Sequence, residues 1–191
     1  LHIPILNMTR AAGVKIIGEI ELAYSITDTP FIGVTGTNGK TTTTSMIGHI
    51  LKECGVSVLV GGNIGKPLVD SVTDFHGDYI VAELSSFQLE SCVTFRPRVA
   101  VYLNLTPDHL DRHGDMDGYA AAKEKIFAQQ KKDDFAVLNL DDEYIKRAAE
   151  HICARKFWFS LHLKPENGIY FDEGVLHYMV DGQEKFSFRT E

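Results

Sequence analysis

The stretch GVTGTNGKTTTT, residues 33–44, contains the residues most suited to chemistry. It follows the apolar run at 31–36, which reads as a short β-strand, and it leads into a helical pattern at 42–55. A glycine-rich turn between a strand and a helix directs backbone N–H groups and the positive helix end toward one point. The sequence therefore predicts a nucleotide phosphate site, with the Lys40 ammonium on the outer phosphates and the Thr41 hydroxyl on Mg²⁺.

The turn is a variant of the common phosphate-binding loop. That pattern places a glycine where this chain has Val34, and Gly33 and Gly36 stand nearby instead. Gly36 and Gly39 allow backbone shapes and a close approach that a Cβ would block. An Asn-Gly-Lys turn also occurs without a ligand, but the flanking strand and helix favour phosphate binding here.

Two further charged residues each allow two interpretations. Glu83 closes an apolar strand at 78–85, so it is either a solvated strand end or a second Mg²⁺ ligand beside the phosphate loop. Lys123 falls on the apolar stripe of a predicted helix at 117–130, whereas Lys125 falls off it. Such a lysine either extends its charge to water or is a buried, partly neutral amine, which can react with carbon dioxide to form a carbamate.

The segment NLTPDHLDRHG, residues 104–114, crowds acidic residues and histidines into one turn. It reads as a capped helix start, with Thr106 or Asp108 as the N-cap and Pro107 early in the helix. One of its residues can also reach a metal, although His109 beside an oxygen-rich Mg²⁺ site would be unusual. A metal-dependent hydrolase would use the whole cluster, but it leaves the phosphate loop unexplained. The cluster comprises Asp108, His109, Asp111 and His113.

Strands and helices alternate along most of the chain, which predicts an α/β fold with a mostly parallel sheet and flanking helices. In such a sheet, functional sites gather at the carboxyl ends of the strands. From Lys156 onward, short strands separated by DEG and DG turns predict hairpins and an antiparallel edge. The predicted strands lie at 31–36, 56–62, 78–85, 98–105 and 134–142, and the predicted helices at 42–55, 117–130 and 143–152.

Composition narrows the class of protein. The net charge of −7 over 191 residues argues against a nucleic-acid-binding protein. No apolar run approaches the roughly 18 residues of a membrane span, and residues 1–10 lack the features of a signal peptide. The three cysteines are far apart in the sequence, which favours the thiols of a cytoplasmic protein over a disulfide framework or a zinc site.

Five motifs together resemble the Mur ligase family: GVTGTNGKTTTT, GGNIGKPL, VAELSSFQLE, NLTPDHLDRHG and YAAAKEKIF. The resemblance runs over roughly residues 12–150, with the P-loop-type ATPase domain of the family as its centre. It implies ATP-dependent formation of an amide bond through an acyl phosphate. Within the family, GGNIG with ELSSFQLE and DHLDRH points to the members that add D-glutamate to UDP-N-acetylmuramoyl-L-alanine in peptidoglycan synthesis.

The resemblance also implies roles for individual residues. Lys40 would hold the γ-phosphate of ATP, Thr41 and Glu83 a first Mg²⁺, and His109 with carbamylated Lys123 a second Mg²⁺. The muramoyl-alanine end of the substrate would face Asn63, Ser85 and Gln88. The phosphate loop would comprise Gly36, Thr37, Asn38, Gly39, Lys40, Thr41 and Thr42.

The resemblance covers only part of a family member. Residues 1–28 resemble the end of an N-terminal UDP-binding domain and its linker, and residues 29–191 a central ATP-binding domain without the G-x-H-N motif or the C-terminal domain. Such a fragment is not expected to make the amide bond alone, and the enzyme is expected to be a cytoplasmic monomer. The alternatives are another Mur ligase, a folylpolyglutamate synthase-like ligase or a nucleotide-switch module. The last of these is weakened because the sequence lacks the N-K-x-D motif with which GTPases bind guanine.

Overall fold

The computed structural model describes residues 4–190, so residues 1–3 of the predicted N-terminal remnant and Glu191 of the tail lie outside it. The strands are β1 Phe31–Thr35, β2 Val58–Gly62, β3 Tyr79–Glu83, β4 Val99–Tyr102, β5 Phe135–Asn139, β6 Arg155–Ser160, β7 Gly168–Asp172, β8 Val175–Val180 and β9 Gln183–Arg189. The helices are α1 Pro4–Ala11, α2 Glu19–Ser25, α3 Lys40–Glu53, α4 Ser86–Glu90, α5 Leu110–His113, α6 Met116–Glu124 and α7 Glu143–Ala149. Short 3₁₀ turns occur at η1 Leu68–Asp70 and η2 Lys125–Phe127.

The strands form a single sheet in the order β2-β3-β1-β4-β5-β6-β7-β8-β9. All neighbours from β2 to β7 are parallel, and the pairs β7–β8 and β8–β9 are antiparallel. The predicted α/β class with an antiparallel C-terminal edge is therefore confirmed. The order places β1 between β3 and β4, so the loops that follow these three strands meet at one edge of the sheet.

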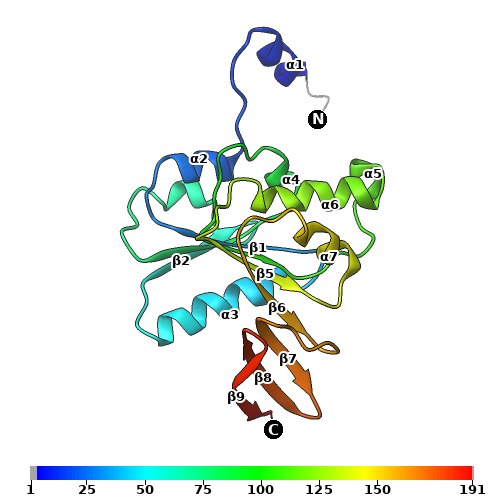
Figure 1. Ribbon diagram of the computed structural model, residues 1–191. Helices are drawn as coiled ribbons and strands as arrows, with labels where there is room; N and C mark the ends of the chain where they lie inside the picture. The colour runs from blue at the N-terminus through cyan, green and yellow to red at the C-terminus, as the bar shows by residue number, and fades with distance from the viewer. Residues whose placement is uncertain (1–3, 191) are drawn as a thin grey trace.

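Helices cover the two faces of the sheet unequally (Figure 1). Helices α2, α4 and α6 lie on one face, and α3 lies on the other. The larger core fills the first face and includes Phe31, Tyr102 and Ile126, whereas Ile47 and Leu51 of α3 pack over a smaller cluster. No helix among the described residues has the length and apolar character needed to cross a membrane.

The helices predicted at 117–130 and 143–152 end earlier than expected, at Glu124 and Ala149. Beyond each end the backbone N–H groups bond to the carbonyl three residues back, as in Ala128 to Lys125 and His151 to Ala148. This tighter 3₁₀ geometry is common at helix ends.

The C-terminal strands extend the sheet away from the helices (Figure 1). The KFWFS segment was expected in the antiparallel part, but β6 pairs parallel with β5 and with β7. The antiparallel part begins at the β7–β8 hairpin, whose turn residues Glu173 and Gly174 both have positive φ. Asp181 and Gly182 repeat this arrangement between β8 and β9, which is the turn type that the DEG and DG signals predict.

Helix α2 packs into the larger core, although it lies within the predicted N-terminal remnant. Ile20 and Ala23 are buried in the same cluster as Phe31 of β1. The Glu21 side chain is 2% exposed and accepts hydrogen bonds from the backbone N–H groups of Val93, Thr94 and Phe95 and from the Thr94 hydroxyl. Burial alone would raise the pKa of Glu21, but these hydrogen bonds outweigh it and hold the pKa below its usual value.

Replacing Glu21 with glutamine is expected to lower the free energy of unfolding by about 2–3 kcal/mol at pH 7, because an amide cannot accept all of these bonds. Since the folded pKa is depressed, the Glu21 contribution is present above pH 4.5 and is lost as the pH falls through the folded pKa. Urea unfolding at several pH values measures both effects. Glu19→Gln is the matched control, because Glu19 accepts one hydrogen bond, from Val69; an equal loss in both variants would contradict the prediction.

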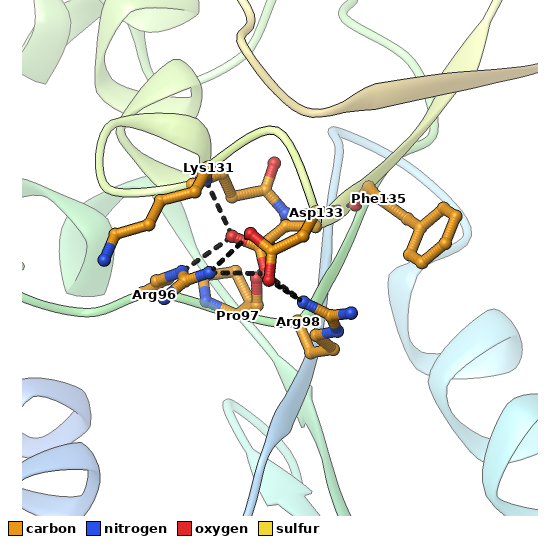
Figure 2. A network of polar contacts seen from close by, with 8 residues as sticks. Arg96, Pro97, Arg98, Lys131, Asp133 and Phe135 are labelled. Carbon is orange, nitrogen blue, oxygen red and sulfur yellow. Dashed lines mark hydrogen bonds and ion pairs between the residues drawn. The ribbon is translucent and has the colours of Figure 1, made fainter.

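A charged network joins the segment before β4 to the turn before β5 (Figure 2). Arg96 and Arg98 both donate hydrogen bonds to Asp133 and Asp134, and the backbone N–H of Lys131 donates to Asp134 as well. The Asp134 side chain is 1% exposed. Burial would raise its pKa, but the hydrogen bonds from Arg96, the Lys131 N–H and Arg98 together outweigh burial, and the pKa lies below its usual value. The network stabilises the sheet at the edge opposite the phosphate loop.

Candidate nucleotide and metal site

The predicted phosphate loop runs from the end of β1 to the start of α3. Gly36 passes so close to β4 that a Cβ there would lie 3.0 Å from the Cβ of Leu103. Gly39 is the N-cap of α3, adopts the left-handed conformation with φ +79°, and gives the helix no side-chain cap. The first N–H groups of α3 therefore have no side-chain partner, which leaves them suited to an anion. The Lys40 amine folds over the loop and donates to the Thr37 carbonyl at 2.8 Å.

Asn104, at the end of β4, clamps the phosphate loop. Its Oδ1 accepts hydrogen bonds from the backbone N–H groups of Thr37 (3.2 Å) and Asn38 (2.8 Å), and its Nδ2 donates to the Asn38 carbonyl at 3.0 Å. Thr106 exchanges hydrogen bonds with the Thr37 hydroxyl and accepts one from the Asn38 side chain. The backbone N–H groups of Thr37 and Asn38 are thus already hydrogen-bonded within the protein. The N–H groups from Gly39 onward are the ones left to bind an anion.

We expect Asn104→Ala to raise the Kd for ATP of the full-length protein about tenfold, because the Asn38 N–H loses its acceptor, the Thr37 N–H keeps only the Asn104 backbone carbonyl, and the loop loses its shape. Isothermal titration calorimetry measures the Kd. Asn139→Ala is the control, since the Asn139 amide donates to the Leu103 carbonyl but does not contact the loop. An unchanged Kd in Asn104→Ala would show that the clamp does not shape the site.

Glu83 lies beside the start of α3, as the Mg²⁺ interpretation requires. Its side chain is 2% exposed, so it is not a solvated strand end. Its Oε2 accepts from the Thr41 hydroxyl at 2.7 Å, and its Oε1 accepts from the Asn63 amide at 2.9 Å. A carboxylate and a hydroxyl at an uncapped helix start are the ligand types that Mg²⁺ prefers. The Asn63 side chain, which the resemblance places toward the substrate, donates this last bond to Glu83.

Lys123 is a buried amine. Its side chain is 1% exposed, so it does not extend its charge to water. The amine donates to the Gly36 carbonyl at 2.7 Å and lies 4.6 Å from the centre of the Tyr119 ring. Burial, and secondarily the charge of Lys40, lowers the pKa of Lys123 to about 7, while Asp108 partly opposes this shift. A neutral amine is therefore available near physiological pH.

His109 packs beside the aromatic rings of Tyr119 and Phe87. Its side chain is 47% exposed, and its ring meets Tyr119 edge-on with the ring centres 6.3 Å apart. His109 itself is the N-cap of α5 and has φ +51°. The expected helix start is therefore wrong: the chain turns at His109, which leaves Thr106, Pro107 and Asp108 outside the helix.

The hydrolase alternative requires several ligands around one metal. Within residues 4–190, no group of three or more histidine, cysteine, aspartate or glutamate side chains is placed to hold a metal ion. His113 lies instead within 2.9 Å of the Ser86 hydroxyl. The 104–114 segment thus supports the phosphate loop and does not form a metal centre of its own.

Ser85 and Gln88, expected to face substrate, cap α4. The Ser85 hydroxyl accepts from the Gln88 backbone N–H at 3.2 Å, and the Gln88 Oε1 accepts from the Ser85 backbone N–H at 3.0 Å. This is a capping box, and the S-x-x-Q spacing in the sequence is its signature. This spacing was a signal in the sequence for the start of α4. The cap fixes the turn that directly follows Glu83.

The structure is an α/β domain with a glycine-rich loop between β1 and α3, and comparison with known proteins identifies its family. The Mur ligase middle domain matches residues 34–188. The chain belongs to the Mur ligase family.

Two curated relatives share the same name, UDP-N-acetylmuramoylalanine--D-glutamate ligase. The chain is 48% identical to that of Pelotomaculum thermopropionicum over 94% of its own length and 40% of the relative, and 44% identical to that of Clostridioides difficile over 97% and 42%. A solved structure of MurF from Thermotoga maritima in complex with ADP has a TM-score of 0.64 and 22% identity, covering 89% of this chain and 42% of that one. The chain thus spans about 40% of the length of these curated relatives.

Proposed function

We propose that the full-length protein is an ATP-dependent ligase that joins D-glutamate to UDP-N-acetylmuramoyl-L-alanine in peptidoglycan precursor synthesis. The observation that carries the proposal is the convergence of Lys40, Thr41 and Glu83 at the uncapped start of α3. The names of relatives at 44% and 48% identity support the choice of substrates. Direct phosphoryl transfer to the substrate carboxylate needs no protein nucleophile.

In this proposal the alanyl carboxylate attacks the γ-phosphorus of ATP, the bond to ADP breaks, and an acyl phosphate forms. The amine of D-glutamate then attacks the acyl carbon, loses a proton, and displaces phosphate. Lys40 leaves the Thr37 carbonyl to bind the γ-phosphate, and the N–H groups at the start of α3 bind the phosphate chain. Mg²⁺ held by Thr41 and Glu83 would neutralise phosphate charge when bound.

A second Mg²⁺ would be held by His109 and by a carbamate on Lys123. The neutral Lys123 amine attacks carbon dioxide, an N–C bond forms, and a proton leaves, so that a cation becomes an anionic oxygen ligand. Burial of the amine and its lowered pKa support this modification. Asn63, Ser85 and Gln88 border the same edge of the sheet and would reach the muramoyl-alanine end after giving up their present partners.

The fragment contains a central ATP-binding domain preceded by an N-terminal remnant. Because α2 packs into the central core, we place the boundary near Gly18 and not at residue 28. Residues 4–190 alone are proposed not to ligate, since the relatives are more than twice as long. Because ATP and UDP-linked precursors are cytoplasmic metabolites, the enzyme is proposed to act in the cytoplasm. It is also proposed to be a monomer.

Phosphate release by the full-length protein tests the proposal. The assay supplies ATP, Mg²⁺ and UDP-N-acetylmuramoyl-L-alanine with D-glutamate, L-glutamate, meso-diaminopimelate or no amino acid. Phosphate release and a new amide product with D-glutamate alone are expected. Product with another amino acid would favour another Mur ligase, and ATP hydrolysis without any product would favour a nucleotide switch.

A further inference from the structure

A serine, a histidine and a glutamate form a chain of polar contacts on the helices next to the proposed phosphate site. The Ser86 hydroxyl is 2.9 Å from Nε2 of His113, and the Nδ1 of the same ring is 3.4 Å from an Oε1 of Glu90. Ser86 and Glu90 are at the two ends of α4, and His113 ends α5. The arrangement resembles the order of groups in a hydrolytic triad.

Burial excludes a nucleophilic role for this serine. Ser86 is 2% exposed, and the His113 side chain is 3% exposed. A serine nucleophile must reach a substrate carbon, and a general base must reach a substrate proton. Ser86, His113 and Glu90 therefore have a structural role and do not contact the substrate.

The His113 ring lies between two aromatic rings. It stacks on Phe87 with ring centres 5.5 Å apart and on Tyr119 with ring centres 5.0 Å apart. With the Ser86 hydroxyl donating to Nε2, the ring proton is on Nδ1 and faces Glu90. Burial lowers the pKa of His113 more than Glu90 raises it, which agrees with a neutral ring.

Tyr119 connects this histidine to the proposed catalytic lysine. The Tyr119 ring supports the Lys123 amine, and its hydroxyl lies 3.5 Å from the Thr37 hydroxyl of the phosphate loop. Through Ser86, His113 is also tied to the helix that follows Glu83. His113 thus joins α4, which begins at the metal-binding edge, to α6, which carries Lys123.

We propose that His113 is a positioning residue, which holds Tyr119 against α4 and thereby keeps the Lys123 amine on the Gly36 carbonyl. The inference rests on the proposed function for its effect on ligation, but not for its effect on Lys123. Two variants separate the contributions: His113→Ala removes the ring, and His113→Phe keeps a ring that can stack on Tyr119. His151→Ala is the control, because His151 is exposed and follows α7.

The first readout is acetylation of Lys123 in the full-length protein, without nucleotide and in buffer purged of carbon dioxide. Mass spectrometry compares Lys123 with the exposed Lys132 in the same sample. Lys123 is expected to react about tenfold faster in His113→Ala than in the wild type, and at the wild-type rate in His113→Phe and His151→Ala. Equal protection in all variants, or equal loss of protection in His113→Phe and His113→Ala, would overturn the inference.

The second readout is steady-state ligation with the same proteins. We expect kcat to fall about tenfold in His113→Ala with the KM for ATP unchanged, because a displaced Lys123 harms the reaction more than nucleotide binding. An unchanged kcat, or a loss confined to KM, would overturn the inference. If the wild type makes no amide, the proposed function fails, while the acetylation result still decides the position of Lys123.

Discussion

Replacing Lys40 with methionine is expected to lower the kcat of the full-length ligase about 10³-fold, because the variant loses the loop amine that would stabilise charge on the transferring phosphoryl group. Methionine keeps the length and the apolar stem of lysine, so α3 is expected to fold normally. Within the described residues, the Lys40 amine bonds only to the Thr37 carbonyl, and its removal leaves no buried charge unpaired. Initial rates of phosphate release measure the effect.

Lys52→Met provides the matched control for this variant. Lys52 is exposed in the last turn of the same helix, far from the loop. We expect wild-type kcat and, at most, a few tenths of a kcal/mol lost through the helix dipole. If Lys40→Met retained a kcat within tenfold of the wild type, the loop would not bind the phosphoryl group as proposed.

Lys123→Met is expected to lower kcat about 10²-fold and to make the remaining activity independent of carbon dioxide. The wild type should lose activity in purged buffer and regain it when bicarbonate is added, because the proposed carbamate forms reversibly on the neutral amine. The pKa of about 7 places the neutral form within reach at physiological pH. Ligation rates with and without bicarbonate measure the dependence.

Lys125→Met separates this effect from a general loss of positive charge. Lys125 is exposed two residues away, and its amine donates to the Glu90 carbonyl. We expect the Lys125 variant to keep the bicarbonate response. A ¹³C NMR signal from labelled carbon dioxide on the wild type, and its loss in Lys123→Met, reports the carbamate without any assay of ligation. A wild type that ignores bicarbonate and shows no such signal would rule the carbamate out.

Much of the fold could be read from local patterns. The apolar strands and the helix after Lys40 follow from periodicity, and the hairpins at Gly174 and Gly182 follow from turn residues that accept positive φ. The parallel pairing of β6 could not be read, because strand direction depends on which neighbour a segment meets and not on its own composition.

Candidate site residues within one sequence motif could be named from the sequence, whereas contacts between distant elements could not. The position of Glu83 at a strand end left two interpretations open, and only the family resemblance placed it with Thr41; in the structure the two side chains are joined by a hydrogen bond. The clamp by Asn104 and the stack on His113 depend on β1 lying beside β4 and on α4 lying beside α6, which no local pattern encodes. The left-handed turn at His109 was also unpredictable, since positive φ is uncommon outside glycine.

The contact between Lys123 and Gly36 joins residues 87 positions apart, which has a consequence for biosynthesis. As the nascent polypeptide leaves the ribosome, its glycine-rich turn emerges well before Asn104 and the helix that carries Lys123. Until those later segments emerge and dock, the early region has exposed strand edges and lacks the Asn104 clamp on its phosphate loop, so we expect slow elongation to favour its misfolding. Synonymous codons that slow translation between these two regions would therefore be expected to reduce the yield of active enzyme in the cell.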